Sequence, residues 1–147
     1  MSLETRYRTE IVIPRTQLVA LHGNFLDTPC GDLLRRALEK VAREEGGYLS
    51  ESYADAAGRS HPAVLAIRTP ECPLGIGVDV EADGRVVFRF DERGPGAATA
   101  RRLCAAVTQI YAVLAVVRAQ AQHGFQVSVE ERQAGDSRHV VVRGVMA

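Results

Sequence analysis

The last third of the chain carries the clearest hydrophobic pattern, a helix-spaced series of apolar residues that ends at a glycine. The series consists of Leu103, Val107, Ile110, Leu114, Val117 and Ala121. Their alternating spacings of four and three place them on one stripe of a helix, which we expect from Ala98 to His123. Gly124 suits the left-handed position after a helix end. The unbroken apolar run, 110–117, is far shorter than the ~20 residues that cross a bilayer, so we expect a core helix and no membrane anchor.

The pattern changes to strict alternation after Gly124. Residues 125–130 alternate between apolar and polar side chains, which predicts a half-buried strand. Residues 133–137 supply a turn, and the valines at 140–142 begin a return strand. The last third of the chain therefore predicts a long helix followed by a β-hairpin.

The first third predicts a strand, a helix and a second strand. Alternation over residues 7–13 gives a strand that the following proline ends. A helix begins at Thr28–Pro29, because threonine caps helices and proline suits the first helical position, and it ends at Gly46–Gly47. We also expect a short helical turn at 16–21 and a strand at 48–53.

The loop between two later strands fixes how they pair. Asp83–Gly84 invites a two-residue hairpin loop. That register would turn the apolar residues of the two strands to opposite faces of the sheet. A three-residue loop at 82–84, with Gly84 left-handed, instead pairs Val80 with Val86 and keeps both apolar sets on one face. We therefore predict the three-residue loop.

The complete order of elements is β-α-β-β-β-β-α-β-β, with the middle strands expected at 63–68, 74–81 and 85–91. Both helices are long enough to cover a sheet face. We predict an α+β fold, a mainly antiparallel sheet with two helices packed on one face, for which a ferredoxin-like core is one possible arrangement. The length of 147 residues suits a single domain spanning 1–147.

Pieces of the C-terminal third resemble a known family. These pieces are Thr108-Gln109-Ile110-Tyr111-Ala112, then Gly124-Phe125-Gln126-Val127, then a valine-rich strand ending in Arg143. They resemble the C-terminal half of the hypothetical chloroplast reading frame thirty-five family, a domain of unknown function found in plastids, cyanobacteria and other bacteria. The resemblance implies a fold and a soluble bacterial or plastid-like setting, without a reaction. It marks Gln109 and Tyr111 as residues of functional interest.

Charge and cysteine content exclude several classes of function. Eighteen basic and 18 acidic residues leave no net charge, which removes the electrostatic argument for a nucleic acid or an anionic membrane surface as a partner. The three cysteines are widely spaced and form no C-x-x-C pair, so we expect free thiols in a reducing compartment. No signal-peptide pattern is visible. A cytoplasmic location follows as the simplest expectation.

The sequence contains no pattern typical of a catalytic or metal site. The histidines and cysteines lack the close spacing of zinc ligands, so we expect neither a metal nor another cofactor. Asp79 and Glu81 fall on the sheet face opposite the apolar residues, where a solvated surface is favoured over acid–base catalysis. Cys30, beside a helix start, is a candidate reactive thiol, with an ordinary packed thiol as the main alternative. His61 is assigned to a loop.

The loop before the long helix is the candidate binding site. Its residues are Arg93, Gly94, Gly96, Arg101 and Arg102. Free backbone N–H groups at a helix N-terminus attract anions, and the arginines add positive charge. The segment lacks both G-x-G-x-x-G and a P-loop lysine, so an ordinary loop and helix start is the main alternative interpretation.

The absence of catalytic patterns leads to a binding function. We predict a protein-interaction or assembly module rather than an enzyme, with another protein or a second copy of the chain as its partner. Val12, Val87 and Val141 on the second face of the sheet suit a moderate interface. The alternative is a small-molecule or anion-binding protein, conceivably an enzyme, that uses Gly94–Arg102.

Overall fold

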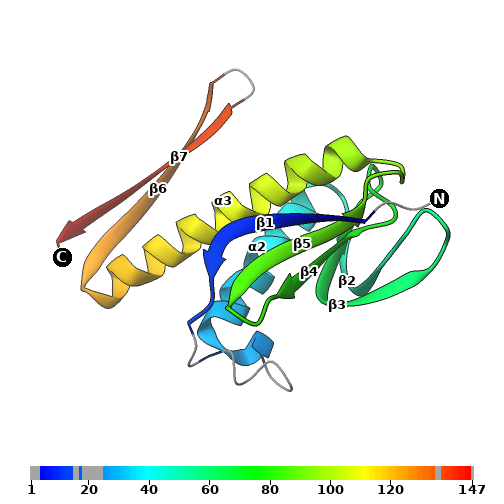
Figure 1. The fold of residues 1–147 in the computed structure, drawn as a ribbon. Helices are drawn as coiled ribbons and strands as arrows, with labels where there is room; N and C mark the ends of the chain where they lie inside the picture. The colour runs from blue at the N-terminus through cyan, green and yellow to red at the C-terminus, as the bar shows by residue number, and fades with distance from the viewer. Residues whose placement is uncertain (1–3, 15–16, 18–24, 135–136, 147) are drawn as a thin grey trace.

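A computed structural model describes residues 4–14, 17, 25–134 and 137–146. Its elements are β1 (Glu4–Val12), the 3-10 helix η2 (Phe25–Asp27), α2 (Pro29–Glu44), β2 (Tyr48–Ala54), β3 (Ser60–Arg68), β4 (Ile76–Val80), β5 (Arg85–Asp91), α3 (Ala97–Gln122), β6 (Phe125–Ala134) and β7 (Ser137–Met146). Figure 1 traces them along the chain. The predicted α+β class and the order of long helices and strands are confirmed. The helical turn expected at 16–21 lies outside the described residues, apart from Gln17.

Five of the strands form one antiparallel sheet in the order β1-β5-β4-β3-β2. Strands β2 to β5 follow one another as a meander, and β1 pairs with the remaining edge of β5. Helix α2 carries the chain from the β1 edge of the sheet to the β2 edge. Because every neighbouring pair is antiparallel, β1 and β2 run parallel to each other, and α2 joins them as a split βαβ unit with three strands between. The strand that follows α3, β6, joins the separate two-stranded sheet instead.

The two long helices begin and end close to the predicted positions. The Thr28 hydroxyl caps α2 by accepting the backbone N–H of Gly31 at 3.1 Å, and Pro29 occupies the first helical position. Helix α3 ends just before Gly124, whose φ of 82° is the left-handed conformation that glycine adopts freely.

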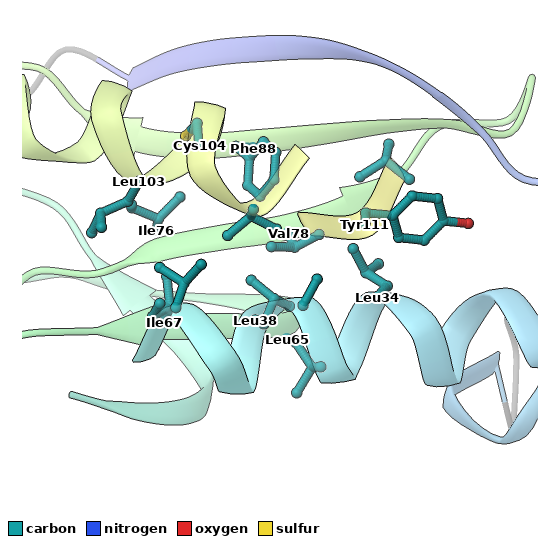
Figure 2. Packing of buried hydrophobic residues seen from close by; sticks show 14 of the residues in the cluster. Leu34, Leu38, Leu65, Ile67, Ile76, Val78, Phe88, Leu103, Cys104 and Tyr111 are labelled. Atoms are coloured by element: carbon teal, nitrogen blue, oxygen red, sulfur yellow. The ribbon is translucent and has the colours of Figure 1, made fainter. Parts of the chain in front are cut away.

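Both helices pack on the same face of the five-stranded sheet. Helix α3 contacts β1 and β5, while α2 contacts β2 and β3, and the helices also contact each other. Figure 2 shows the side chains that fill the space between them, among them Leu34, Leu38, Ile67, Ile76, Val78, Phe88 and Leu103. Fully burying an aliphatic or aromatic side chain of this size stabilises the fold by about 1.5–3 kcal/mol. This core holds the strands in place. Among the described residues no helix covers the other side of the sheet, here named the second face.

The hairpin between β4 and β5 has the predicted register. Val80 pairs with Val86, and Gly84 is left-handed with a φ of 93°. The backbone N–H of Gly84 donates to the carbonyl of Glu81 at 2.8 Å. A Cβ at Gly84 would stand 2.5 Å from the carbonyl oxygen of Ile13, so glycine is required for close packing as well as for the turn.

Strands β6 and β7 pair only with each other and form a second, two-stranded sheet. This hairpin packs against α3 and stands apart from the five-stranded sheet (Figure 1). Val141 therefore does not lie on the second face, and that prediction is wrong. Alternation identifies which face of a strand is apolar, but it does not identify the sheet that the strand joins.

The second face is charged rather than apolar. The Glu81 carboxylate forms ion pairs with Nη1 of Arg6 at 3.2 Å and with Nε of Arg8 at 3.4 Å. Asp79 lies 3.8 Å from Arg89, and burial raises the pKa of this half-buried carboxyl. Because the charged side chains surround it, Val87 has 0% of its surface exposed. Val12 is exposed at the end of the edge strand, so of the three valines expected on this face it is the one that is accessible, and an interface on this face stays a prediction.

Candidate functional site

A polar cavity of about 170 Å³ opens where the starts of β1 and β3 meet the ends of β2 and β5. Its lining residues are Glu4, Tyr53, Asp55, Arg59, His61 and Asp91. They come from four strands and one turn, and Glu4 and Asp91 are far in sequence from the other four, which lie within residues 53–61. We refer to this site as the polar cavity.

The side chain of Tyr53 links the two edge strands of the sheet through a hydrogen bond. Its hydroxyl donates to Glu4 Oε1 at 2.9 Å, although β2 and β1 lie at opposite edges of the sheet. A register shift between Ser50 and Ser52 lets the end of β2 leave its regular path. The backbone N–H of Ala54 then donates to the carbonyl of Leu74, ahead of β4, at 2.8 Å. The end of β2 thus crosses over the sheet.

Asp55 organises the turn between β2 and β3. Its Oδ1 accepts the backbone N–H groups of Ala57 and Arg59, both at 2.9 Å. Its Oδ2 lies 2.9 Å from Nε2 of His61 and 3.2 Å from Nε of Arg59. The hydrogen bond to His61 and the backbone N–H of Arg59 lower the pKa of the Asp55 carboxyl to about 2. Asp55 is therefore a stable carboxylate.

Asp91 ties the same turn to the end of β5. Its Oδ2 accepts the backbone N–H of Ala56 at 2.8 Å, and its Oδ1 accepts that of Arg93 at 2.9 Å. Asp55 and Asp91 are each 6% exposed. A buried carboxylate is tolerated where it accepts several hydrogen bonds. The two carboxylates therefore form a fixed floor for the polar cavity.

His61 and Arg59 complete the cavity on its outer side. The His61 ring stacks on Tyr53 with 5.2 Å between ring centroids and 21° between ring planes. The Arg59 side chain is 72% exposed and uses Nε towards Asp55. The assignment of His61 to a loop is wrong, because β3 begins one residue earlier, at Ser60. Chemically, this arrangement can hold a small polar or charged molecule.

The arginines of the predicted anion site point to carboxylates instead of converging. Arg101 forms an ion pair with Glu92 and lies over the Phe90 ring, 5.8 Å from its centroid. Arg102 donates to both carboxylate oxygens of Glu45, at 2.8 and 3.0 Å. These pairs explain how two arginines are accommodated in the first turns of a helix, where positive charge is unfavourable.

The remaining residues of that predicted site, Arg93, Gly94 and Gly96, have structural roles in the loop through their backbones. Gly96 caps α3 in the left-handed conformation, and a Cβ there would stand 2.0 Å from the carbonyl oxygen of Glu71. A Cβ at Gly94 would approach the Leu74 side chain. Arg93 contributes its backbone N–H to Asp91, at the floor of the polar cavity. The loop therefore packs closely, and its role in anion binding stays a prediction.

Tyr111 lies at the edge of the core, and Figure 2 shows its hydroxyl directed away from the other labelled side chains. This hydroxyl is hydrogen-bonded to Cys30 at the start of α2, and burial raises its pKa above the usual range. Gln109 is half-buried on the same helix, two positions before Tyr111. The structure therefore joins Tyr111 to Cys30 rather than to the polar cavity.

All three cysteines are free thiols. Cys72 and Cys104 are buried in the core, and burial raises the pKa of both thiols. Cys30 is half-buried, and its backbone N–H donates to the side chain of Gln17 at 2.9 Å. Within the part of the chain that the structure describes, no three histidine, cysteine or acidic side chains form a group able to hold a metal ion.

Searches of protein-family models, of curated proteins and of solved structures gave no match for this chain. The resemblance of the C-terminal third to the chloroplast reading frame family therefore stays an expectation from sequence.

Proposed function

We propose that the protein is a protein-interaction module that acts through its C-terminal arm, defined here as residues 112–146. The residues of α3 that are buried all lie between Ala100 and Tyr111. Beyond Tyr111 the helix stays apolar, with Val113, Leu114, Val116 and Val117, but it loses close cover. Only 28% of its most apolar 18-residue stretch is buried. This incompletely covered apolar helix is the observation that carries the proposal.

The hairpin at the end of the arm supports the same proposal. An isolated two-stranded hairpin is marginal in water, and it gains stability from a third strand or from apolar cover. The outer edges of β6 and β7 also leave backbone hydrogen-bonding groups available to another chain. A bound partner would complete both the hairpin and the helix beneath it.

A groove beside the arm adds concave surface. It has a volume of about 950 Å³ and lies between the start of α2 and the second half of α3. Leu26, Leu33, Leu114 and Val117 supply its apolar lining, and Asp32, Arg36 and Arg118 are among its charged residues. Apolar centres with charged rims are typical of surfaces that bind other proteins.

We propose a second copy of the chain as the first partner to test. Two of the exposed large apolar residues, Val116 at 44% and Val145 at 64% exposure, lie on the arm. A two-fold axis brings the same patch of two copies together, so a patch that pairs with itself suffices for a dimer. The apolar patch and the open strand edges are both able to pair in this way.

Analytical ultracentrifugation over a concentration series tests this proposal. We expect a dimer whose dissociation constant rises at least tenfold in the Val116→Glu variant, because the glutamate would be buried without a partner. Ala105→Glu is the matched control, since Ala105 is exposed on the same helix outside the arm. A protein that stays monomeric at about 100 µM would overturn the second-copy proposal.

Membrane binding is the competing outcome. By length and composition alone, α3 is apolar enough to span a bilayer. Flotation with neutral lipid vesicles therefore accompanies the sedimentation experiment. A monomeric protein that floats with vesicles, and that loses flotation in Val116→Glu but not in Ala105→Glu, would contradict the protein-interaction module.

A further inference from the structure

We propose that the polar cavity binds a small zwitterion of the α-amino-acid class, a property separate from the interaction function of the arm. The cavity has buried walls and an exposed rim whose groups carry opposite charges. Its volume of about 170 Å³ equals roughly six water molecules at about 30 Å³ each. Small amino acids such as alanine and serine fit within this volume, whereas most cofactors and nucleotides are far too large for it.

Glu4 and the groups around it are suited to bind the ammonium group of such a ligand. Glu4 is exposed, and Tyr53 occupies one of its carboxylate oxygens, Oε1. Its other oxygen has no partner among the described residues. Three carboxylates and a single guanidinium line the cavity, so the local charge favours a cation over a simple anion. The phenol of Tyr53 is held neutral by burial and by Glu4, which leaves its oxygen able to accept a further hydrogen bond.

Arg59 is suited to bind the carboxylate group of the ligand. Its Nε contacts Asp55, while the two terminal nitrogens of the guanidinium have no partner among the described residues. A guanidinium presents paired N–H donors whose geometry fits a carboxylate. A molecule that carries only an ammonium group would leave Arg59 unused. A zwitterion therefore uses both charged groups of the rim.

The cavity is built before any ligand arrives. The oxygens of Asp55 and Asp91 accept backbone N–H groups from four residues, so the turn that carries Arg59 is fixed. His61 is held between Asp55 and the Tyr53 ring. A preformed site binds more tightly than a flexible one, because less conformational entropy is lost on binding. The fixed groups form the floor and wall, while the unpaired atoms lie on the rim.

An NMR titration of the intact protein with L-alanine tests the proposal. We expect alanine at about 10 mM to shift the amide signals of Ala57 and Arg59, with ethylamine and propionate binding at least tenfold more weakly. Glu4→Gln and Arg59→Gln should each weaken alanine binding at least tenfold. Arg43→Gln, an exposed change on α2, is the matched control and should leave binding unchanged.

The same spectra show whether each variant is folded, so loss of binding is distinguished from loss of structure. Unchanged amide signals with alanine at this concentration would overturn the proposal. Equal affinity for ethylamine and alanine would overturn it as well, because Arg59 would then contribute nothing. Neither result depends on whether the protein forms dimers.

Discussion

The ring of Tyr53 occupies the space that a side chain at residue 77 would fill. A Cβ added to Gly77 would stand 2.4 Å from Cδ1 and 2.5 Å from Cε1 of that ring. The missing side chain on β4 is what lets the end of β2 cross the sheet. Tyr53 then reaches Glu4, and the polar cavity forms between them.

We predict that Gly77→Ala destabilises the protein by about 1–3 kcal/mol, the usual effect of overpacking a closely packed site. Urea unfolding of the purified variant measures the change. The control is a double-mutant cycle with Tyr53→Ala, which removes the ring. A penalty of the same size in the Tyr53→Ala background would show that the ring is not the cause.

Asp55 predicts a loss of stability in acid. Its carboxyl has a pKa of about 2 in the folded protein, below the usual 3.8, so the folded state favours the ionised form. The stabilisation is fully present above the pKa of the unfolded chain, near pH 4, and is lost as the pH falls towards 2. We expect the free energy of unfolding of Asp55→Asn to depend less on pH in this range than that of the parent protein. Urea unfolding between about pH 2.5 and 6 measures this difference.

The matched control for the acid experiment is Asp83→Asn, a change in the exposed β4–β5 loop. This variant should keep the acid dependence of the parent protein. If Asp55→Asn kept it too, the hydrogen bonds from His61 and Arg59 would have no part in acid stability.

Tyr53 predicts the opposite behaviour in alkali. Burial and the carboxylate of Glu4 raise the pKa of this phenol, so the folded state favours its neutral form. The resulting stabilisation is complete below the usual tyrosine pKa of about 10 and is lost as the pH rises through the folded-state pKa. Because burial also raises the pKa of Tyr111, ultraviolet titration should show two late-ionising tyrosines, of which one disappears in Tyr53→Phe. A titration curve of unchanged shape in that variant would place the late ionisation elsewhere.

The arginines at the start of α3 yield a prediction about anions. Because Arg101 and Arg102 are already paired with Glu92 and Glu45, we expect inorganic phosphate to produce no arginine-dependent rise in melting temperature. Differential scanning fluorimetry of the parent protein and of Arg101→Ala/Arg102→Ala measures this. A phosphate-induced rise that the double variant abolishes would restore the anion-binding alternative.

Local signals predicted much of the fold. Threonine and proline at 28–29 marked the start of α2, and Gly124 marked the end of α3, because both ends depend on the conformation of one or two residues. The β4–β5 register followed from keeping Val80 and Val86 on the same face. In each case the deciding interaction lies within a few positions of the chain.

The polar cavity could not be predicted in this way. Tyr53 meets Glu4 across 49 positions, and Asp91 meets Ala56 across 35. These contacts depend on a register shift in β2 and on the absence of a side chain at Gly77, neither of which leaves a periodic pattern. The one local signal was the spacing of Asp55 and His61 on either side of a turn that contains Gly58.

The pairing of β1 with β5 has a consequence for how the chain is synthesised. Thr9 donates its hydroxyl to the carbonyl of Val86, 77 positions later, so the first strand leaves the ribosome long before its partner exists. The meander of β2 to β5 contains only neighbours and is able to assemble first, since short loops close at lower entropic cost. Until β5 has been made, β1 has no partner strand for its backbone hydrogen bonds. During that interval the nascent chain is most susceptible to wrong strand pairing and to binding by a chaperone.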